Sequence, residues 1–192
     1  NPDRLLAVTS DVGGRWRFRV TQEVAANPHL SPYLASGFEP IRMECECAHL
    51  SIEGRIPEEL DGTFYRIGPS PQFPPRGIYN PLNGDGMVHA FDINRGRVSY
   101  RNRWVRTQQW KIDRDAGRAM FGTSGKPADS DPSVAAMRTD GVANTNLIYH
   151  GGKLFALEEG HAPIEIHPET LETVGRWNFQ GRLPRNMTAH PK

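Results

Sequence analysis

The stretch ANTNLIYHGGKLFALEEGHAPIEIHPETLETVGRW, residues 143–177, decides the fold, and the chain runs on from it to NMTAHPK at residues 186–192. It reads as strand, Gly-Gly turn, strand, short turn, strand, Pro-Glu-Thr turn and strand. Short β segments with turn residues at this close spacing are typical of a propeller blade, whereas a βαβ unit would need a helix between its strands.

The β pattern extends upstream to about Leu50. Residues 62–67 (GTFYRI) predict a short strand, and residues 68–85 form a loop rich in Pro and Gly. Residues 87–93 and 97–106 flank an Asn-Arg-Gly turn and predict a hairpin. The best helical candidate in this part of the chain is residues 111–121, which a polar loop at 122–141 follows.

Composition narrows the class of protein. The chain is 37% hydrophobic with a formal net charge of +1, and its basic residues form no stripe, which argues against a nucleic-acid partner. Apolar runs stay shorter than a dozen residues, which argues against a spanning helix and a secretory signal. Cys45 and Cys47 have no second pair to complete a metal site, so two reduced thiols and a cytoplasmic location are the expectation.

Residues 1–40 differ from the rest and are assigned to an N-terminal arm, with residues 41–192 as the first blades of an incomplete propeller. Within the arm, Arg15–Val20 alternates basic and apolar side chains. Such alternation suits an edge strand, an arm lying on the body, or a surface that touches membrane headgroups.

Several motifs in a fixed order carry a resemblance to one family. They are GRIP at 54–57, LDGTFYRIGP at 60–69, NGDGMVH at 83–89, LFALEEG at 154–160, PETLET at 168–173 and TAHPK at 188–192. Together, from about residue 27 to the end of the chain, they resemble the carotenoid cleavage oxygenases, non-haem iron enzymes that split conjugated C=C bonds with dioxygen. Each motif is weak alone, but their ordered combination is specific.

The resemblance implies an all-β fold: a seven-bladed β-propeller with a helical and loop cap over one face, of which this chain covers only the N-terminal part. A blade takes about 40–50 residues, so 192 residues correspond to two or three blades and the arm. The 192-residue piece alone is expected to be inactive.

The resemblance also implies a ferrous ion, Fe(2+), held by four histidines. His190 matches the first of these ligands, and the other three would lie beyond Lys192. Glu159 matches an outer-shell carboxylate that accepts a hydrogen bond from a ligand imidazole. Spacing alone does not single out His190 among the seven histidines. The six others are assigned to surface, capping or packing positions: His29, His49, His89, His150, His161 and His167.

Departures from the family bear on the substrate. The stilbene-cleaving branch of the family binds a phenol through a Phe, a Tyr and a Lys. This chain has Leu82, Ser124 and Glu158 at the matching positions. A carboxylate in place of an ammonium would repel a phenolate. An apocarotenoid or similar lipophilic alkene, cleaved with O2 to two carbonyl products, is therefore the expected substrate, and a stilbene-cleaving (lignostilbene-type) dioxygenase is the alternative.

Two further classes of function stay open. One is a family member that carries out metal-dependent isomerisation or hydrolysis without oxygen, and the other is a non-catalytic propeller that acts as a binding module. Peripheral contact with a membrane is expected only by analogy with relatives that act on lipophilic molecules.

Overall fold

The computed structural model describes residues 7–10, 16–19, 31–122, 127–183 and 186–192, in two compact units that divide after Leu30. The described part of the first unit is a two-stranded antiparallel hairpin of β1 (Ala7–Ser10) and β2 (Trp16–Arg19). β2 lies within the alternating residues 15–20, for which a strand was one of the alternatives. The second unit, residues 31–192, carries the candidate site.

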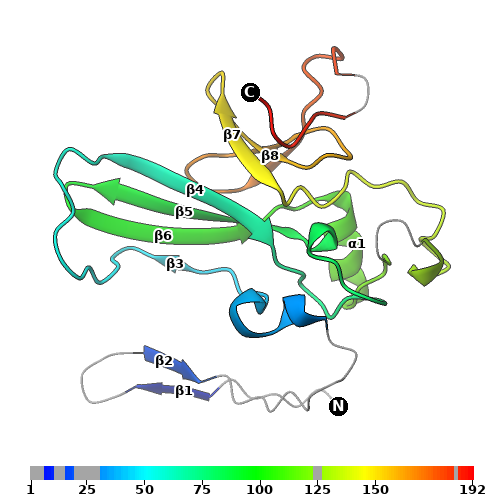
Figure 1. Ribbon diagram of the computed structural model, residues 1–192, viewed down its shortest axis with the longest axis horizontal. Helices are drawn as coiled ribbons and strands as arrows, with labels where there is room; N and C mark the ends of the chain where they lie inside the picture. Colours follow the sequence, from blue (N-terminus) through cyan, green and yellow to red (C-terminus); the bar gives the residue numbers. More distant parts are fainter. Residues whose placement is uncertain (1–6, 11–15, 20–30, 123–126, 184–185) are drawn as a thin grey trace. The chain divides into compact units, whose positions relative to one another are not determined.

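The first sheet of this unit holds four antiparallel strands in the order β3-β6-β5-β4 (Figure 1). They are β3 (Glu46–Cys47), β4 (Gly62–Pro69), β5 (Gly86–Asn94) and β6 (Arg97–Trp104). The predicted hairpin is confirmed. Arg95 and Gly96 turn it with φ of 46° and 74°, the left-handed backbone that matches the twist of the two strands.

The second sheet confirms the predicted blade-like meander. Its strands, in spatial order β10-β9-β8-β7, are all antiparallel. They are β7 (Asn146–His150), β8 (Lys153–Leu157), β9 (Ile164–Ile166) and β10 (Thr173–Arg176). Gly151 and Gly152, with φ of 58° and 78°, form the first turn, as the Gly-Gly pair predicted.

The helix α1 (Gln108–Ala116) begins and ends earlier than the predicted range of 111–121. Thr107 accepts a hydrogen bond from the backbone N–H of Trp110 and so caps the N-terminus, while Gly117 adopts the left-handed conformation that ends the helix. The cap and the glycine fix these bounds. Single 3₁₀ turns occur at Pro32–Leu34, Ser36–Phe38, Pro81–Asn83 and Pro127–Asp129.

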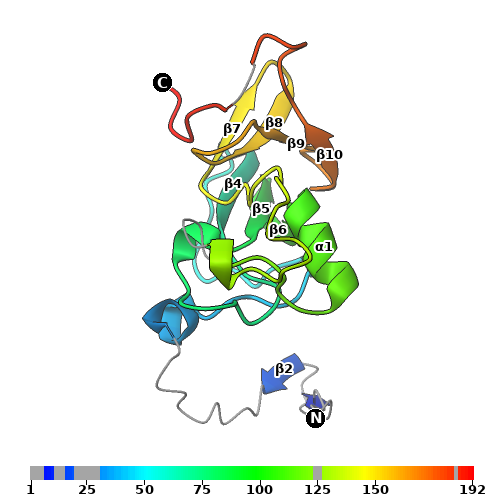
Figure 2. The same ribbon diagram turned by 90° about the vertical axis from the view of Figure 1, so that its right-hand side faces the viewer.

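The two sheets share one apolar core. Val88 and Ala90 of β5 pack with buried side chains from the second sheet, so the sheets lie against each other, as Figures 1 and 2 show. The members from the second sheet and its turns are Leu154, Ala156, Ile164, Ile166 and Leu171. Residues 31–192 are therefore an all-β unit with antiparallel sheets and a single α-helix among the residues described.

Among the described ranges, no helix combines the length and the apolar character that crossing a bilayer requires.

Truncation of Leu154, whose side chain is 1% exposed in the shared core, tests this packing. We expect Leu154→Ala in the full-length protein to lower the free energy of unfolding by about 2–5 kcal/mol, because it leaves a cavity between the sheets. Chemical denaturation measures the change. Val174→Ala, at a side chain that is 62% exposed, is the control and should cost much less. Equal effects of the two substitutions would contradict the shared core.

Candidate functional site

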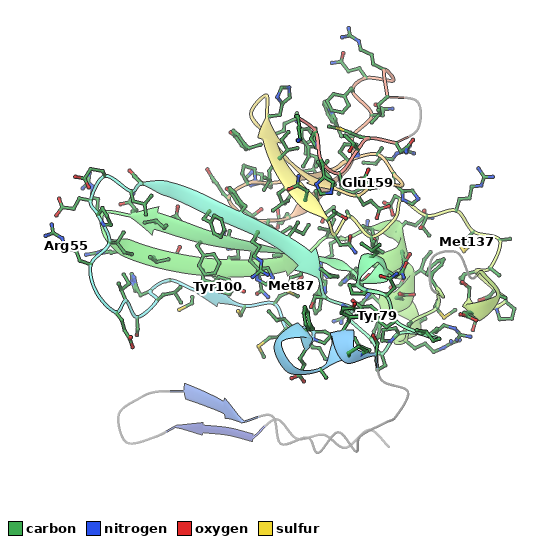
Figure 3. All side chains as sticks on the ribbon, in the orientation of Figure 1. Arg55, Tyr79, Met87, Tyr100, Met137 and Glu159 are labelled. Carbon is green, nitrogen blue, oxygen red and sulfur yellow. The ribbon has the colours of Figure 1, made fainter. Side chains whose placement is uncertain are left out.

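A cleft of about 580 Å³ opens in the second unit, where the loop before β7 and the turn after β8 come together. Leu82, Glu158 and Glu159, all singled out from the sequence, lie on its wall; Glu159 and another wall residue, Met137, are labelled in Figure 3. Ser124 lies outside the described residues. The cleft therefore gathers two of the three predicted substrate-lining residues beside the predicted outer-shell carboxylate.

Glu158 holds the cleft wall together. One carboxylate oxygen, Oε2, accepts hydrogen bonds from the backbone N–H groups of Val142 (2.6 Å) and Ala143 (2.9 Å). The other oxygen, Oε1, is hydrogen-bonded to Nδ1 of His161. Burial alone would raise the pKa of Glu158, but the hydrogen bonds from His161 and the two amides outweigh burial and lower it. Glu158 is therefore a carboxylate whose two oxygens are both engaged.

Gly141 is required where this wall bends. Its φ is +81°, and an added Cβ would lie 2.4 Å from both Glu158 Oε1 and His161 Nδ1. The neighbouring Ala143 also takes a positive φ, 47°, which is costly for a residue with a Cβ. The hydrogen bonds to Glu158 offset that cost, so the carboxylate and the bent backbone depend on each other.

His161, which the sequence analysis assigned to a surface or capping position, is a cleft residue. It lines the cleft, and its side chain is 41% exposed. The hydrogen bond that His161 donates to Glu158 raises the pKa of His161. The charges of Glu158 and Asp140 act in the same direction, whereas burial and the charge of Arg176 oppose it. The spacing of Glu and His three residues apart in a Gly-containing turn was the signal that could have revealed the pair.

His190 lies near Glu159. Nε2 of His190 is 3.8 Å from Oε1 of Glu159, with both side chains more than 60% exposed. The preceding Ala189 is fully buried, and its carbonyl accepts a hydrogen bond from Nδ2 of Asn146. The buried alanine and the strand β7 thus fix the backbone that presents His190. The residues present fit one imidazole ligand with a nearby carboxylate.

A complete metal centre is not formed by these residues alone. In the described ranges, no group of three or more His, Cys, Asp and Glu side chains is placed to hold a metal ion. Imidazole ligands suit ferrous iron, and a site that uses His190 needs further ligands from elsewhere.

Two buried carboxyl groups lie next to the cleft. Asp85 and Asp113 line a cavity of about 30 Å³, large enough for one water molecule, which shares wall residues with the cleft. Burial raises the pKa of Asp85 to about 7, and the charge of Asp113 adds to the shift. Burial likewise raises the pKa of Asp113 to about 6 and that of Tyr79 to about 12. The proton on Asp85 is thus part of the folded state near neutral pH.

Solved structures share this fold. The crystal structure of Pseudomonas brassicacearum lignostilbene dioxygenase aligns with a TM-score of 0.79 at 39% identity, covering 84% of this chain and 34% of that one. A mutant of the Synechocystis apocarotenoid oxygenase aligns with a TM-score of 0.67 at 33% identity, covering 80% of this chain and 33% of that one. The part of the chain that aligns therefore has the fold of these oxygenases.

Sequence comparisons name the family. The family model described as "Retinal pigment epithelial membrane protein" matches residues 38–192. Lignostilbene-alpha,beta-dioxygenase isozyme III of Sphingomonas paucimobilis is 43% identical over 80% of this chain and 31% of its own length. Resveratrol cleavage oxygenase 1 of Aspergillus fumigatus is 44% identical over 82% and 32%. The chain belongs to this family, which includes the carotenoid cleavage oxygenases, and spans about a third of the length of these relatives.

The buried proton of Asp85 predicts a pH dependence of stability. Because the folded-state pKa, about 7, lies above the ordinary value of 3.8, the folded state holds a proton that the unfolded chain releases. The contribution of Asp85 to stability should therefore fall as pH rises from about 4 to 7, by at most about 1.4 kcal/mol per pH unit, and then level off. The measurement is the free energy of unfolding of full-length wild type and Asp85→Asn across this range.

The Asp85→Asn variant should lose the part of this slope that Asp85 contributes, because its amide does not titrate, and should keep the part that the raised pKa of Asp113 contributes between about pH 4 and 6. Asp115→Asn, at an exposed position of α1, is the matched control and should follow the wild-type profile. An unchanged slope in Asp85→Asn would assign the titration to another group.

Proposed function

We propose that the full-length protein is a non-haem Fe(II) dioxygenase that cleaves a conjugated C=C bond of a lipophilic alkene with O2 to give two carbonyl products. The observation that carries the proposal is the 3.8 Å approach of His190 to Glu159, a residue of the cleft wall, in a chain that belongs to this oxygenase family. Relatives at 38–44% identity are named lignostilbene dioxygenase, resveratrol cleavage oxygenase, isoeugenol monooxygenase and carotenoid cleavage oxygenase.

The proposed architecture of the whole protein is a seven-bladed propeller with a helical and loop cap over one face. Each sheet of the second unit has four antiparallel strands, the size of one blade, which supports this proposal. Side chains of the α1 region and of the loop after it, among them Gln109, Phe121 and Val134, line the cleft and suit a cap over it. The remaining blades would supply the other three histidines.

Bound iron would supply the centre at which dioxygen and the alkene react. His190 would contribute a neutral imidazole ligand. Glu159 would accept a hydrogen bond from the ring N–H of a ligand histidine, and so hold that ring in one orientation and one tautomer. The apolar wall residues Leu82, Phe121 and Val134 would bind the hydrocarbon part of the substrate and exclude water from it.

The environment of Glu158 bears on whether the substrate is an apocarotenoid or a stilbene. We expected its carboxylate to repel a phenolate and so to favour an apocarotenoid. Both of its oxygens, however, are engaged by Val142, Ala143 and His161, so the wall offers no free carboxylate there. That reason for preferring an apocarotenoid over a stilbene therefore loses its force, and the proposal covers conjugated alkenes of both kinds. The cytoplasmic location and peripheral membrane contact stay predictions.

Replacement of His190 tests the metal site. We expect His190→Ala in the full-length protein to lose most of its iron and nearly all oxidative cleavage, while the apolar core keeps the fold intact. Glu159→Gln should reduce iron affinity or activity by about 10–100-fold, as outer-shell changes typically do. Iron stoichiometry, oxygen uptake and product formation are measured on one preparation of each variant.

His150→Ala is the matched control, since His150 is exposed at the end of β7, and it should keep iron and activity. Full iron content in His190→Ala would show that the ligand assignment is wrong. Iron retention with turnover but no oxygen uptake would point to the isomerase or hydrolase alternative.

A further inference from the structure

We propose that His161, held in place by Glu158, is a specificity-determining residue that donates a hydrogen bond to an oxygen on the substrate. The inference rests on the proposed function and narrows it. The substrate class becomes a conjugated alkene that carries a hydroxyl, phenolate, carbonyl or carboxylate oxygen.

The contact with Glu158 fixes the orientation of the His161 imidazole. Nδ1 of His161 is bonded to Oε1 of Glu158, and the other carboxylate oxygen is held by two backbone amides. His161 is one of the residues that line the cleft, and Nε2 is the ring nitrogen that the contact with Glu158 leaves unused. Among the described residues, Nε2 has no hydrogen-bonding partner. A ring fixed at one end in this way presents its other nitrogen to a ligand at little cost in side-chain entropy.

The surrounding charges favour a proton on this nitrogen. Glu158 is the closest charge and raises the pKa of His161 above its ordinary value, with Asp140 acting in the same direction and Arg176 opposing it. The bond to Glu158 keeps one proton at Nδ1, so the second proton of the charged ring resides at Nε2. An Nε2–H of an imidazolium is a charge-assisted donor that suits an oxygen acceptor.

The other polar groups of the cleft wall are mostly committed to the protein. Nδ2 of Asn144 donates to the carbonyl of Gly84 at 2.7 Å, and Oγ1 of Thr145 donates to Asn144. Oγ of Ser130 accepts from the N–H of Gly122, and Oγ1 of Thr139 accepts from the N–H of Gly141. Within the described wall, Nε2 of His161 is thus open to a ligand, together with the side-chain amide of Gln109 and the exposed carboxylate of Glu159.

The apolar side chains of the wall suit the hydrocarbon part of such a substrate. Leu82, Phe121, Val134, Met137 and Val142 line the same cleft as His161. A ligand with a flat conjugated body and one oxygen would suit both the apolar wall and His161, whereas a pure hydrocarbon would leave Nε2 of His161 without a hydrogen-bonding partner.

The first experiment measures the histidine itself. NMR titration of the full-length protein with labelled histidine should give His161 a pKa above the ordinary value of 6.5. In Glu158→Gln, the pKa should move back toward that value, because the charge that holds the second proton is gone. An unshifted His161 in the wild type, or an unchanged value in Glu158→Gln, would overturn the inference.

The second experiment measures ligand choice without turnover. Iron-loaded full-length protein is titrated under anaerobic conditions with two matched pairs, 4-hydroxystilbene against stilbene, and an apocarotenoid alcohol against its parent hydrocarbon. We expect the oxygenated member of at least one pair to bind roughly 10- to 100-fold more tightly, the range for a hydrogen bond to a charged group. His161→Leu should abolish this preference, keep iron, and leave affinity for the hydrocarbons nearly unchanged.

The outcomes separate this inference from the proposed function. His150→Leu, at an exposed strand end, is the control and should keep the preference. Cleavage of the alkenes without any preference for an oxygenated ligand, or a preference that survives in His161→Leu, would overturn the role of His161 and leave the oxygenase standing. Failure of the wild type to bind or cleave either pair would overturn the proposed function and this inference with it.

Discussion

The crossing of residues 142–144 against residues 84–86 joins the two sheets and fixes the wall of the cleft. Gly86 donates its backbone N–H to the carbonyl of Val142 at 2.9 Å, and Nδ2 of Asn144 donates to the carbonyl of Gly84 at 2.7 Å. The backbones approach so closely that a Cβ on Gly86 would lie 2.2 Å from the carbonyl oxygen of Ala143. No side chain fits between the two backbones at this point. β5 of the first sheet therefore begins at its contact with the segment that leads into β7 of the second sheet.

Glu158 also holds this segment, residues 142–144, in place. Its carboxylate satisfies two amides that the crossing leaves at the cleft wall, and it orients His161 with its second oxygen. One side chain thus connects the packing of the two sheets to the electrostatics of the cleft. A buried carboxylate needs such partners to remain charged, and the bent backbone needs the carboxylate to satisfy its N–H groups, so neither would be stable in this form alone.

The Gly-Asp-Gly segment at the start of β5 gains a physical explanation from this arrangement. A Cβ on Gly84 would lie 2.4 Å from the hydroxyl oxygen of Tyr79, and Gly86 meets the backbone of Ala143, so both glycines are required by close approach. Asp85 between them is buried, and the N–H of Gln72 donates to its Oδ2 at 3.0 Å. The motif that carried much of the resemblance is thus a packing element at the base of the cleft.

The sequence by itself determined the strands from β4 onward, their turns and the family. Paired glycines, the Asn-Arg-Gly turn and alternating strands are local patterns, because turn geometry and side-chain direction depend on neighbours a few residues apart. The bounds of α1 depended on its cap, and the partners of His190 and Glu158 depended on contacts between distant segments. Only the tertiary structure decided that Glu158 is an internal anchor and that His161 faces the cleft, because burial and hydrogen-bond partners are set by what packs around a residue and not by its place in the chain.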